Sequence, residues 1–194
     1  MRWTRWIAIT SSFAAVAVAA VMVSCATPPA KPAAMTPQEK LARGEHLVVV
    51  LGCGDCHTPG SLYGAPDAHR LLSGSELGWT GPWGTSYARN ITPDSTTGIG
   101  TWSADDIVKA IRVGQRPDGS PILPPMPWQD FANLTDDEAY AVAAYIKSVA
   151  PVAHKVSDRL RPGVRAPAAL VFPPPPKWDA PLTPPAGAGS SAPH

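Results

Sequence analysis

The stretch Leu51-Gly52-Cys53-Gly54-Asp55-Cys56-His57-Thr58-Pro59 places two cysteines three positions apart and a histidine directly after the second one. A Cys-x-x-Cys pair serves three different chemistries in proteins. It can form a redox-active disulfide, supply half of a zinc site, or attach a haem group covalently. The sequence around the pair decides which of the three applies.

The residues in and around this stretch favour haem attachment. Cys53 and Cys56 are spaced to reach the two vinyl groups of one porphyrin, and His57 then binds the iron through one ring nitrogen. The other ring nitrogen is expected to donate to a backbone carbonyl. A thioredoxin-like site needs a preceding strand, but here a helix precedes the pair. A zinc site needs further ligands, but no second cysteine pair follows. We therefore expect one covalently bound haem c.

A second iron ligand is predicted far along the chain, in Pro124-Pro125-Met126-Pro127-Trp128. Three prolines stiffen this segment, so it can hold a weak thioether bond with little loss of entropy. Met126 is therefore the expected sixth ligand, and His69 and His154 are the alternatives. With His57 and Met126 as metal ligands, both axial positions are filled, which favours electron transfer over haem catalysis and predicts no catalytic residue.

The N-terminus has the features of an export signal. Basic residues precede an uncharged apolar run over residues 6–23, and Ser24-Cys25 follows. The end of the run resembles the lipobox of bacterial lipoproteins, in which the signal is cleaved before the cysteine and the thiol carries lipid. Cleavage after Ala26 and an uncleaved transmembrane anchor are the alternatives. Since all three export the chain, we expect a periplasmic protein anchored to the membrane, by lipid on Cys25 or by the N-terminal segment.

Three helices are predicted in the exported part of the chain. Each begins with a capping signal, and each ends near a glycine or a proline. The linking segments are rich in Gly, Pro, Ser and Thr and predict long loops, with at most a short hairpin around Gly84–Asn90. The helices are expected at about residues 37–51, 103–113 and 135–149.

Helices without strong strand signals predict an all-α domain with a Pro-rich extended tail. Eleven of the 24 prolines lie after residue 150, where the backbone must be extended and polyproline-like. The expected divisions are a signal peptide at 1–25, a Pro/Ala-rich tether at 26–35, the helical domain at 36–150 and the tail at 151–194.

Charge is divided unevenly along the chain. The formal net charge of +1 gives no reason to expect a nucleic-acid partner. Residues 36–150 hold 8 basic and 13 acidic side chains, whereas residues 151–194 hold 5 basic and 2 acidic ones. The basic tail can lie across the acidic domain as a strap, reach an acidic partner or lipid headgroups, or stay disordered, and the sequence leaves these alternatives open.

The order helix, Cys-x-x-Cys-His, loops, helix, Pro-Pro-Met-Pro, helix resembles a class I c-type cytochrome. More narrowly, the stretches Asn90–Asp94, Thr97–Gly100 and Pro124–Pro127 are similar to the cytochrome c subunits of bacterial membrane-bound alcohol, aldehyde and sugar-acid dehydrogenases. The resemblance covers about residues 40–155. Those subunits carry several haem modules, whereas this chain has one Cys-x-x-Cys-His motif and so resembles one module.

The resemblance implies a small cytochrome c fold, with three main helices and long loops around one haem c. It gives Cys53, Cys56, His57 and Met126 the family's haem-binding roles. It also implies that a proline carbonyl holds the axial histidine, for which Pro82 is the candidate. The implied partners are a dehydrogenase as electron donor and a cytochrome or an oxidase as acceptor.

Two other functions remain open at this point. One is a peroxidase-like haem enzyme in which Met126 leaves the iron. The other is a thiol oxidoreductase without haem, based on the cysteine pair. A further expectation concerns Arg89, which is either a partner of a haem propionate or a solvated surface residue.

The lipobox-like ending predicts the effect of Cys25→Ser. Because serine cannot carry the thioether-linked lipid, we expect the variant to leave the membrane fraction and to lack the lipid mass of the wild-type protein. Fractionation and mass spectrometry of the intact chain check this. An unchanged mass in a variant that stays membrane-bound would contradict lipid attachment at Cys25.

Overall fold

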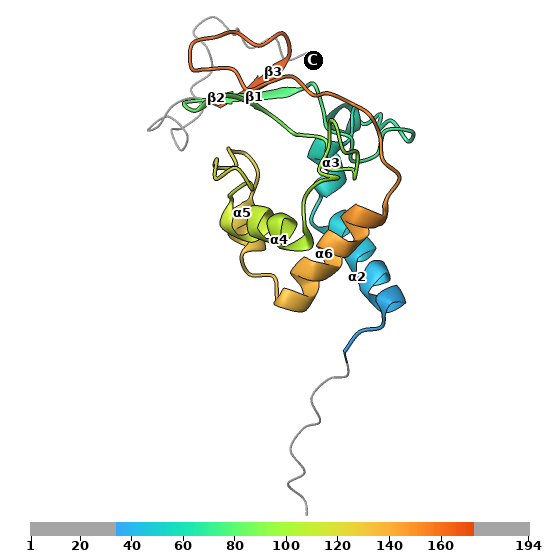
Figure 1. Cartoon of the computed structure of the whole chain (residues 1–194). Helices are drawn as coiled ribbons and strands as arrows, with labels where there is room; N and C mark the ends of the chain where they lie inside the picture. Colours follow the sequence, from blue (N-terminus) through green and yellow to red (C-terminus); the bar gives the residue numbers. More distant parts are fainter. Residues whose placement is uncertain (1–33, 173–194) are drawn as a thin grey trace, which may run out of the picture. The chain divides into compact units, whose positions relative to one another are not determined.

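The computed structural model describes residues 34–172. The predicted signal peptide, most of the tether and the run Pro173–Pro176 lie outside the described residues. Residues 36–172 form one unit, which is shown in Figure 1.

Three longer helices carry the domain, and all three begin where the sequence predicts. They are α2 (Pro37–Val50), α4 (Ala104–Val113) and α6 (Asp136–Ser148). Each starts with a reciprocal capping box, in which the N-cap hydroxyl and the acid three residues later exchange hydrogen bonds with backbone N–H groups. The three predicted helix starts are thereby confirmed.

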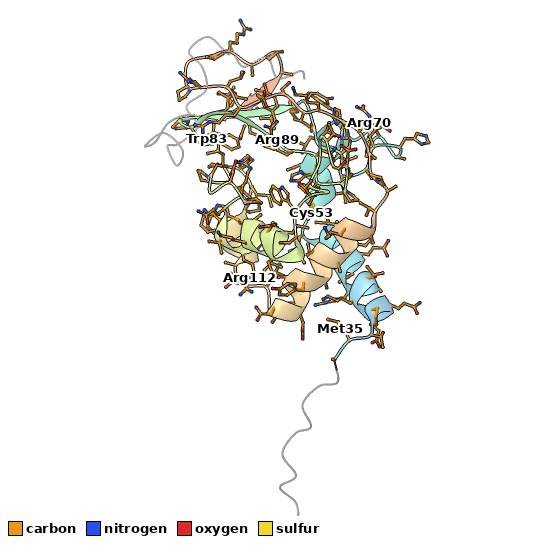
Figure 2. All side chains as sticks on the ribbon, viewed as in Figure 1. Met35, Cys53, Arg70, Trp83, Arg89 and Arg112 are labelled. Carbon is orange, nitrogen blue, oxygen red and sulfur yellow. The ribbon has the colours of Figure 1, made fainter. Side chains whose placement is uncertain are left out.

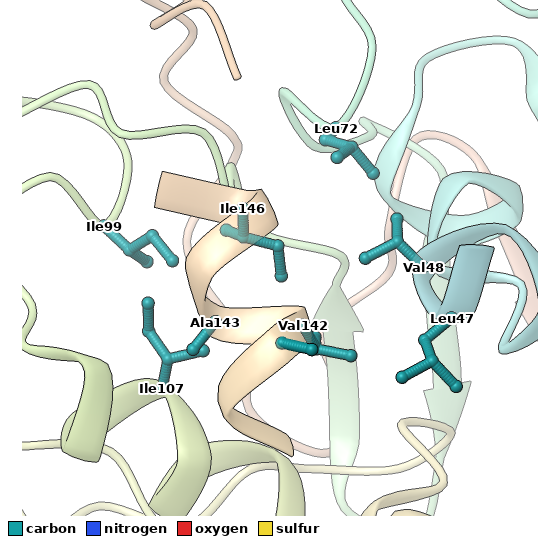
Figure 3. Close-up of a cluster of buried hydrophobic side chains, with 9 residues drawn as sticks. Leu47, Val48, Leu72, Ile99, Ile107, Val142, Ala143 and Ile146 are labelled. Carbon is teal, nitrogen blue, oxygen red and sulfur yellow. The ribbon is translucent and has the colours of Figure 1, made fainter. Parts of the chain in front are cut away.

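The core lies where α2 and α6 pack together. Val142 and Ile146 of α6 meet Leu47 and Val48 of α2, and α4 contributes Ile107 (Figure 3). Burying such side chains removes apolar surface from water and supplies the main stabilising free energy of a small domain. Cys53 packs against the edge of this cluster, so the core continues to the cysteine pair.

Gly44 allows the close approach of α2 and α6. A Cβ atom at this position would overlap the carbonyl oxygen of Ala141 and would lie 2.8 Å from the Cβ atom of Tyr145. The sequence predicts this contact, because Gly44 lies on the first predicted helix without a side chain and so permits close approach of Tyr145 on the last helix. The prediction is confirmed.

Several short helices were not predicted. They are α3 (Cys53–His57), a 3₁₀ turn η1 (Ser61–Tyr63) and α5 (Trp128–Phe131). Elements of one turn are too short to show a helical period in sequence. Within residues 34–172, no helix has both the length and the hydropathy required to cross a bilayer.

A small sheet accompanies the helices, so the all-α expectation holds only in part. Strands β1 (Gly78–Gly81) and β2 (Gly84–Tyr87) form an antiparallel hairpin, and β3 (Ala169–Val171) adds to β1 in parallel, so the strand order is β2-β1-β3. The hairpin begins six residues before the expected one. The pairing of β3 joins segments about 90 residues apart, which no local sequence signal can predict.

Residues 151–172, which we call the strap, cross the hairpin after α6 ends (Figure 1). Leu160 and Thr85 exchange two backbone hydrogen bonds of 3.0 Å. Near β3, Gly78 donates to the Ala168 carbonyl and Phe172 donates to the Thr80 carbonyl. Of the alternatives for the C-terminal tail, a strap that lies across the domain is therefore the one observed up to residue 172.

The helix crossing predicts the effect of Gly44→Ala. Because the added methyl group meets backbone, α2 and α6 must separate, and we expect a loss of about 3 kcal/mol in the free energy of unfolding. Urea unfolding followed by circular dichroism measures the loss. The neighbouring exposed substitution Glu45→Ala should change the same quantity by less than about 0.5 kcal/mol. Equal effects of the two substitutions would contradict the close crossing.

Candidate functional site

The cysteine pair and the histidine share one helical turn, α3. Gly52 precedes it in the left-handed conformation, with φ at 66°, and so turns the chain sharply out of α2. Residues three and four apart on a helix lie on the same face, so Cys53 is a neighbour of both Cys56 and His57. Figure 2 shows Cys53 between the sheet that carries Trp83 and the helix that carries Arg112.

Both thiols are free and poorly suited to thiol redox chemistry. Cys53 and Cys56 form no disulfide. Burial raises the pKa of Cys53 to about 11 and also raises the pKa of Cys56. Thiol oxidoreductases need a lowered pKa, because the thiolate is the nucleophile. Burial of the two thiols and the raised pKa values that it causes therefore disfavour the thiol oxidoreductase alternative.

His57 is oriented by a hydrogen bond from Nδ1 to the carbonyl oxygen of Arg89, at 2.6 Å. Since a carbonyl only accepts, Nδ1 carries the proton and Nε2 keeps its lone pair. Burial lowers the pKa of His57, against the opposing effect of the Arg89 bond, which favours the neutral ring that metals bind. The expected carbonyl partner is thus present, but it belongs to Arg89. The assignment to Pro82 was wrong, because Pro82 lies at the hairpin turn.

Nε2 of His57 is available for a ligand. It has no hydrogen-bond partner among residues 34–172, and no unpartnered side-chain nitrogen there is fully buried, so this atom is not enclosed by protein. Two reduced thiols on the same turn accompany it. This donor set fits a haem c, for which the thiols would form thioethers and Nε2 would bind iron.

Two further bonds fix α3 to the loop that follows. The His57 carbonyl accepts from the Gly74 N–H at 2.7 Å, and the buried Thr58 hydroxyl accepts from the Leu72 N–H at 3.1 Å. Groups around a metal ligand limit its motion and hold its orientation. The loop at 72–74 therefore fixes the backbone of the imidazole that Arg89 orients.

The segment that contains Met126 is attached to strand β2 of the hairpin. Ser86 Oγ of β2 donates to the Pro124 carbonyl at 2.5 Å, and Trp128 packs on Gly114 at the end of α4. From Ser86 to Arg89 the chain spans at most about 11 Å. One short stretch therefore holds both the His57 ring and the loop of half-buried Met126.

The two alternative histidine ligands differ in availability. Both ring nitrogens of His154 are engaged, Nδ1 with the Ser73 carbonyl at 2.8 Å and Nε2 with Glu76 at 2.6 Å. His69 lies exposed on a loop. Within the described part of the chain, no three His, Cys, Asp or Glu side chains gather into a metal-binding group. His154 is therefore engaged by protein groups, and His69 stays an alternative to Met126.

The side chain of Arg89 binds the strap. Its guanidinium donates to the carbonyls of Val156 and Ser157 and to Asp158, at 2.8–3.1 Å. The group is therefore committed to the strap, and the expectation of a propionate partner is not supported. Arg89 connects the strap to His57, through its side chain on one side and its carbonyl on the other.

Asn90, the next residue, is a buried hydrogen-bonding centre that the sequence analysis did not identify as functional. Its Oδ1 accepts from the N–H and hydroxyl of Thr92, and its Nδ2 donates to Thr97 Oγ1 and to the Val152 carbonyl. Only 2% of Asn90 is exposed. The signal that could have identified Asn90 is its place at the start of Asn90–Asp94, one of the stretches similar to other cytochrome c subunits.

Comparisons with known proteins agree with this geometry. The sequence profile of the cytochrome c family matches residues 41–150. The chain is 41% identical over 58% of its length to an alcohol dehydrogenase (quinone) cytochrome c subunit of Gluconobacter oxydans. It is 35% identical over 63% to a fructose dehydrogenase cytochrome subunit of Gluconobacter japonicus, and 40% identical over 60% to a gluconate 2-dehydrogenase cytochrome c subunit of Pantoea cypripedii. The aligned part covers 22–25% of these relatives.

The Asn90 network predicts the effect of Asn90→Ala. The substitution leaves buried donors and acceptors without partners, so we expect a loss of about 3 kcal/mol in the free energy of unfolding. Urea unfolding measures it, with the exposed neighbour Ser95→Ala as a control expected to lose less than about 0.5 kcal/mol. Similar values for both variants would show that the network contributes little.

Proposed function

The chain belongs to the cytochrome c family, and we propose that it carries single electrons through one haem c attached to Cys53 and Cys56. The observation that carries this proposal is the 2.6 Å bond from His57 Nδ1 to the Arg89 carbonyl, which leaves Nε2 free beside two reduced thiols. The sequence contains one Cys-x-x-Cys-His motif, which supports a single haem.

The residues of the site have distinct tasks in this function. A haem c bound there supplies a one-electron iron couple. Cys53 and Cys56 would hold the group covalently, and Nε2 of His57 would bind the iron. The Arg89 carbonyl fixes the tautomer and the ring orientation, and it raises the basicity of the ligand. The ring therefore needs little reorganisation when one electron arrives or leaves.

Met126 is the proposed sixth ligand. The Ser86–Pro124 bond and the packing of Trp128 on Gly114 support this by holding the segment on both sides of Met126. With His57 and Met126 both bound to the iron, no position would remain for a substrate, so the protein would act as an electron-transfer component and not as a catalyst. The peroxidase-like alternative requires Met126 to leave the iron. It predicts rapid cyanide binding to the ferric protein, whereas a stable Met126 bond predicts slow binding.

We propose a dehydrogenase as electron donor and a cytochrome or an oxidase as acceptor. The relatives named above are cytochrome subunits of alcohol, fructose and gluconate dehydrogenases, which supports a donor of this class. Because the matched region is a quarter or less of each relative, it corresponds to part of such a subunit.

We further propose export to the periplasm and anchoring through lipid on Cys25, for which the N-terminal sequence is the support.

The proposed ligand predicts the effect of Met126→Ala. A thioether stabilises Fe(II) relative to Fe(III) more than imidazole or water does, so its loss should lower the reduction potential. We expect a fall of at least about 100 mV, well within the ~0.8 V over which axial ligands tune haem. Spectroelectrochemical titration of the haem-loaded protein measures it.

Met35→Ala is the matched control, because Met35 precedes the domain and is partly exposed. Its potential and spectrum should equal those of the wild type. Equal reduction potentials for all three proteins would exclude Met126 as a ligand. They would also remove the support that this ligand gives to the electron-carrier function. Absence of haem from the wild-type protein, expressed with haem-attachment machinery, would refute the proposed function itself.

A further inference from the structure

We propose that the segment Lys155–Arg165 of the strap, the basic loop, is the surface on which an acidic redox protein docks. The inference rests on the proposed electron-transfer function and adds the chemistry of the partner. The loop carries four basic side chains, all exposed, and one acidic side chain. The basic residues are Lys155, Arg159, Arg161 and Arg165.

The single acid of the loop is neutralised from within the domain. Asp158 pairs with Arg89 at 3.1 Å. Among residues 34–172, Lys155, Arg161 and Arg165 have no ion pair, and the Arg159 guanidinium donates only to the Trp83 carbonyl. The loop therefore presents uncompensated positive charge to the solvent.

The basic loop lies beside the proposed haem site. Arg159 precedes Leu160, which bonds to Thr85 of the hairpin, and Arg89 reaches the loop while its carbonyl holds His57. A partner on this surface would be close to the site, as electron transfer requires. Arg116 is affected by the same charges: burial lowers its pKa most, the charges of Arg89 and Arg159 lower it further, and Asp118 opposes them.

The opposite charge gathers at another part of the domain. The N-termini of α4 and α6 carry carboxylates, of which Asp136 pairs with Arg112 and Glu138 with Arg43. In Figure 1 the body of α6 lies below the sheet, and its C-terminal end continues into the strap. Because α6 carries three acidic side chains and one basic one, its charge is opposite to that of the basic loop, and this difference helps to orient an acidic partner during encounter. The acidic residues at the two N-termini are Asp105, Asp106, Asp136, Asp137 and Glu138.

The composition of the strap favours a protein partner over a lipid surface. Val164, Leu170 and Val171 are large apolar residues that remain 45–73% exposed on the same strap. Apolar contacts with charged side chains around them are typical of protein interfaces, in which the charges steer the encounter and the apolar groups stabilise the complex.

The test uses the haem-loaded protein and reduced plant-type ferredoxin, an acidic protein of low potential. One electron passes from the ferredoxin to the ferric cytochrome, and stopped-flow absorbance follows it. We expect Arg165→Glu to slow the second-order rate about fivefold at low salt, and Arg161→Glu/Arg165→Glu to slow it more than tenfold. The differences should vanish at high salt, where charges are screened.

Lys109→Glu is the matched control. It changes the net charge equally, but from an exposed position on α4. We expect it to change the ferredoxin rate less than twofold. With hexaammineruthenium(II), a cationic reductant, Arg165→Glu should raise the rate instead.

Three results would overturn the inference. Equal slowing by Arg165→Glu and Lys109→Glu would show an effect of net charge alone. Unchanged rates in the strap variants would show that the partner docks elsewhere. Unchanged ferredoxin rates, together with binding to phosphatidylglycerol vesicles that Arg161→Glu/Arg165→Glu abolishes, would assign the loop to lipid. A wild-type protein that accepts no electron from either reductant would refute the proposed function, which is a different outcome.

Discussion

The hydrogen bond from His57 Nδ1 to the Arg89 carbonyl is the constraint on which the site depends. It fixes the imidazole only if the backbone at Arg89 is itself fixed, and the neighbouring residues do this. Thr85 pairs with Leu160 of the strap, Ser86 holds the Met126 loop through Pro124, and Asn90 bonds to the first residues of the strap. Six consecutive residues thus carry the contacts that relate the proposed axial ligands to the rest of the fold.

The parts of the fold that follow from local chemistry were predictable from sequence. The capping boxes at Thr36, Ser103 and Thr135 depend on residues three apart, so they can be recognised without a structure. The motif at Cys53–His57 is local in the same sense. Gly44 was paired with Tyr145 because helices that cross closely need a small residue at the contact.

The parts that depend on distant pairing were not predictable. Strand β3 is three residues long and exists because β1 offers an unpaired edge about 90 residues earlier. The same holds for the carbonyl that binds His57. Any residue can supply a backbone carbonyl, so side-chain identity gave no signal, and the assignment to Pro82 came from resemblance alone. The sequence could predict that a carbonyl is needed but not that Arg89 supplies it.

In the strap, the groups that attach it to the domain differ from the groups that carry its exposed charge. Its attachment to the hairpin uses backbone groups, through Leu160, Ala168 and Phe172, and its buried anchor is Val156. The side chains of Arg161 and Arg165 take no part in these bonds within the described residues. The segment can therefore complete the sheet through its backbone, while its exposed charged side chains stay available for a partner. Because Arg89 neutralises Asp158 and its carbonyl also holds His57, the Arg89–Asp158 ion pair both helps to fix the ligand and leaves the strap surface positive.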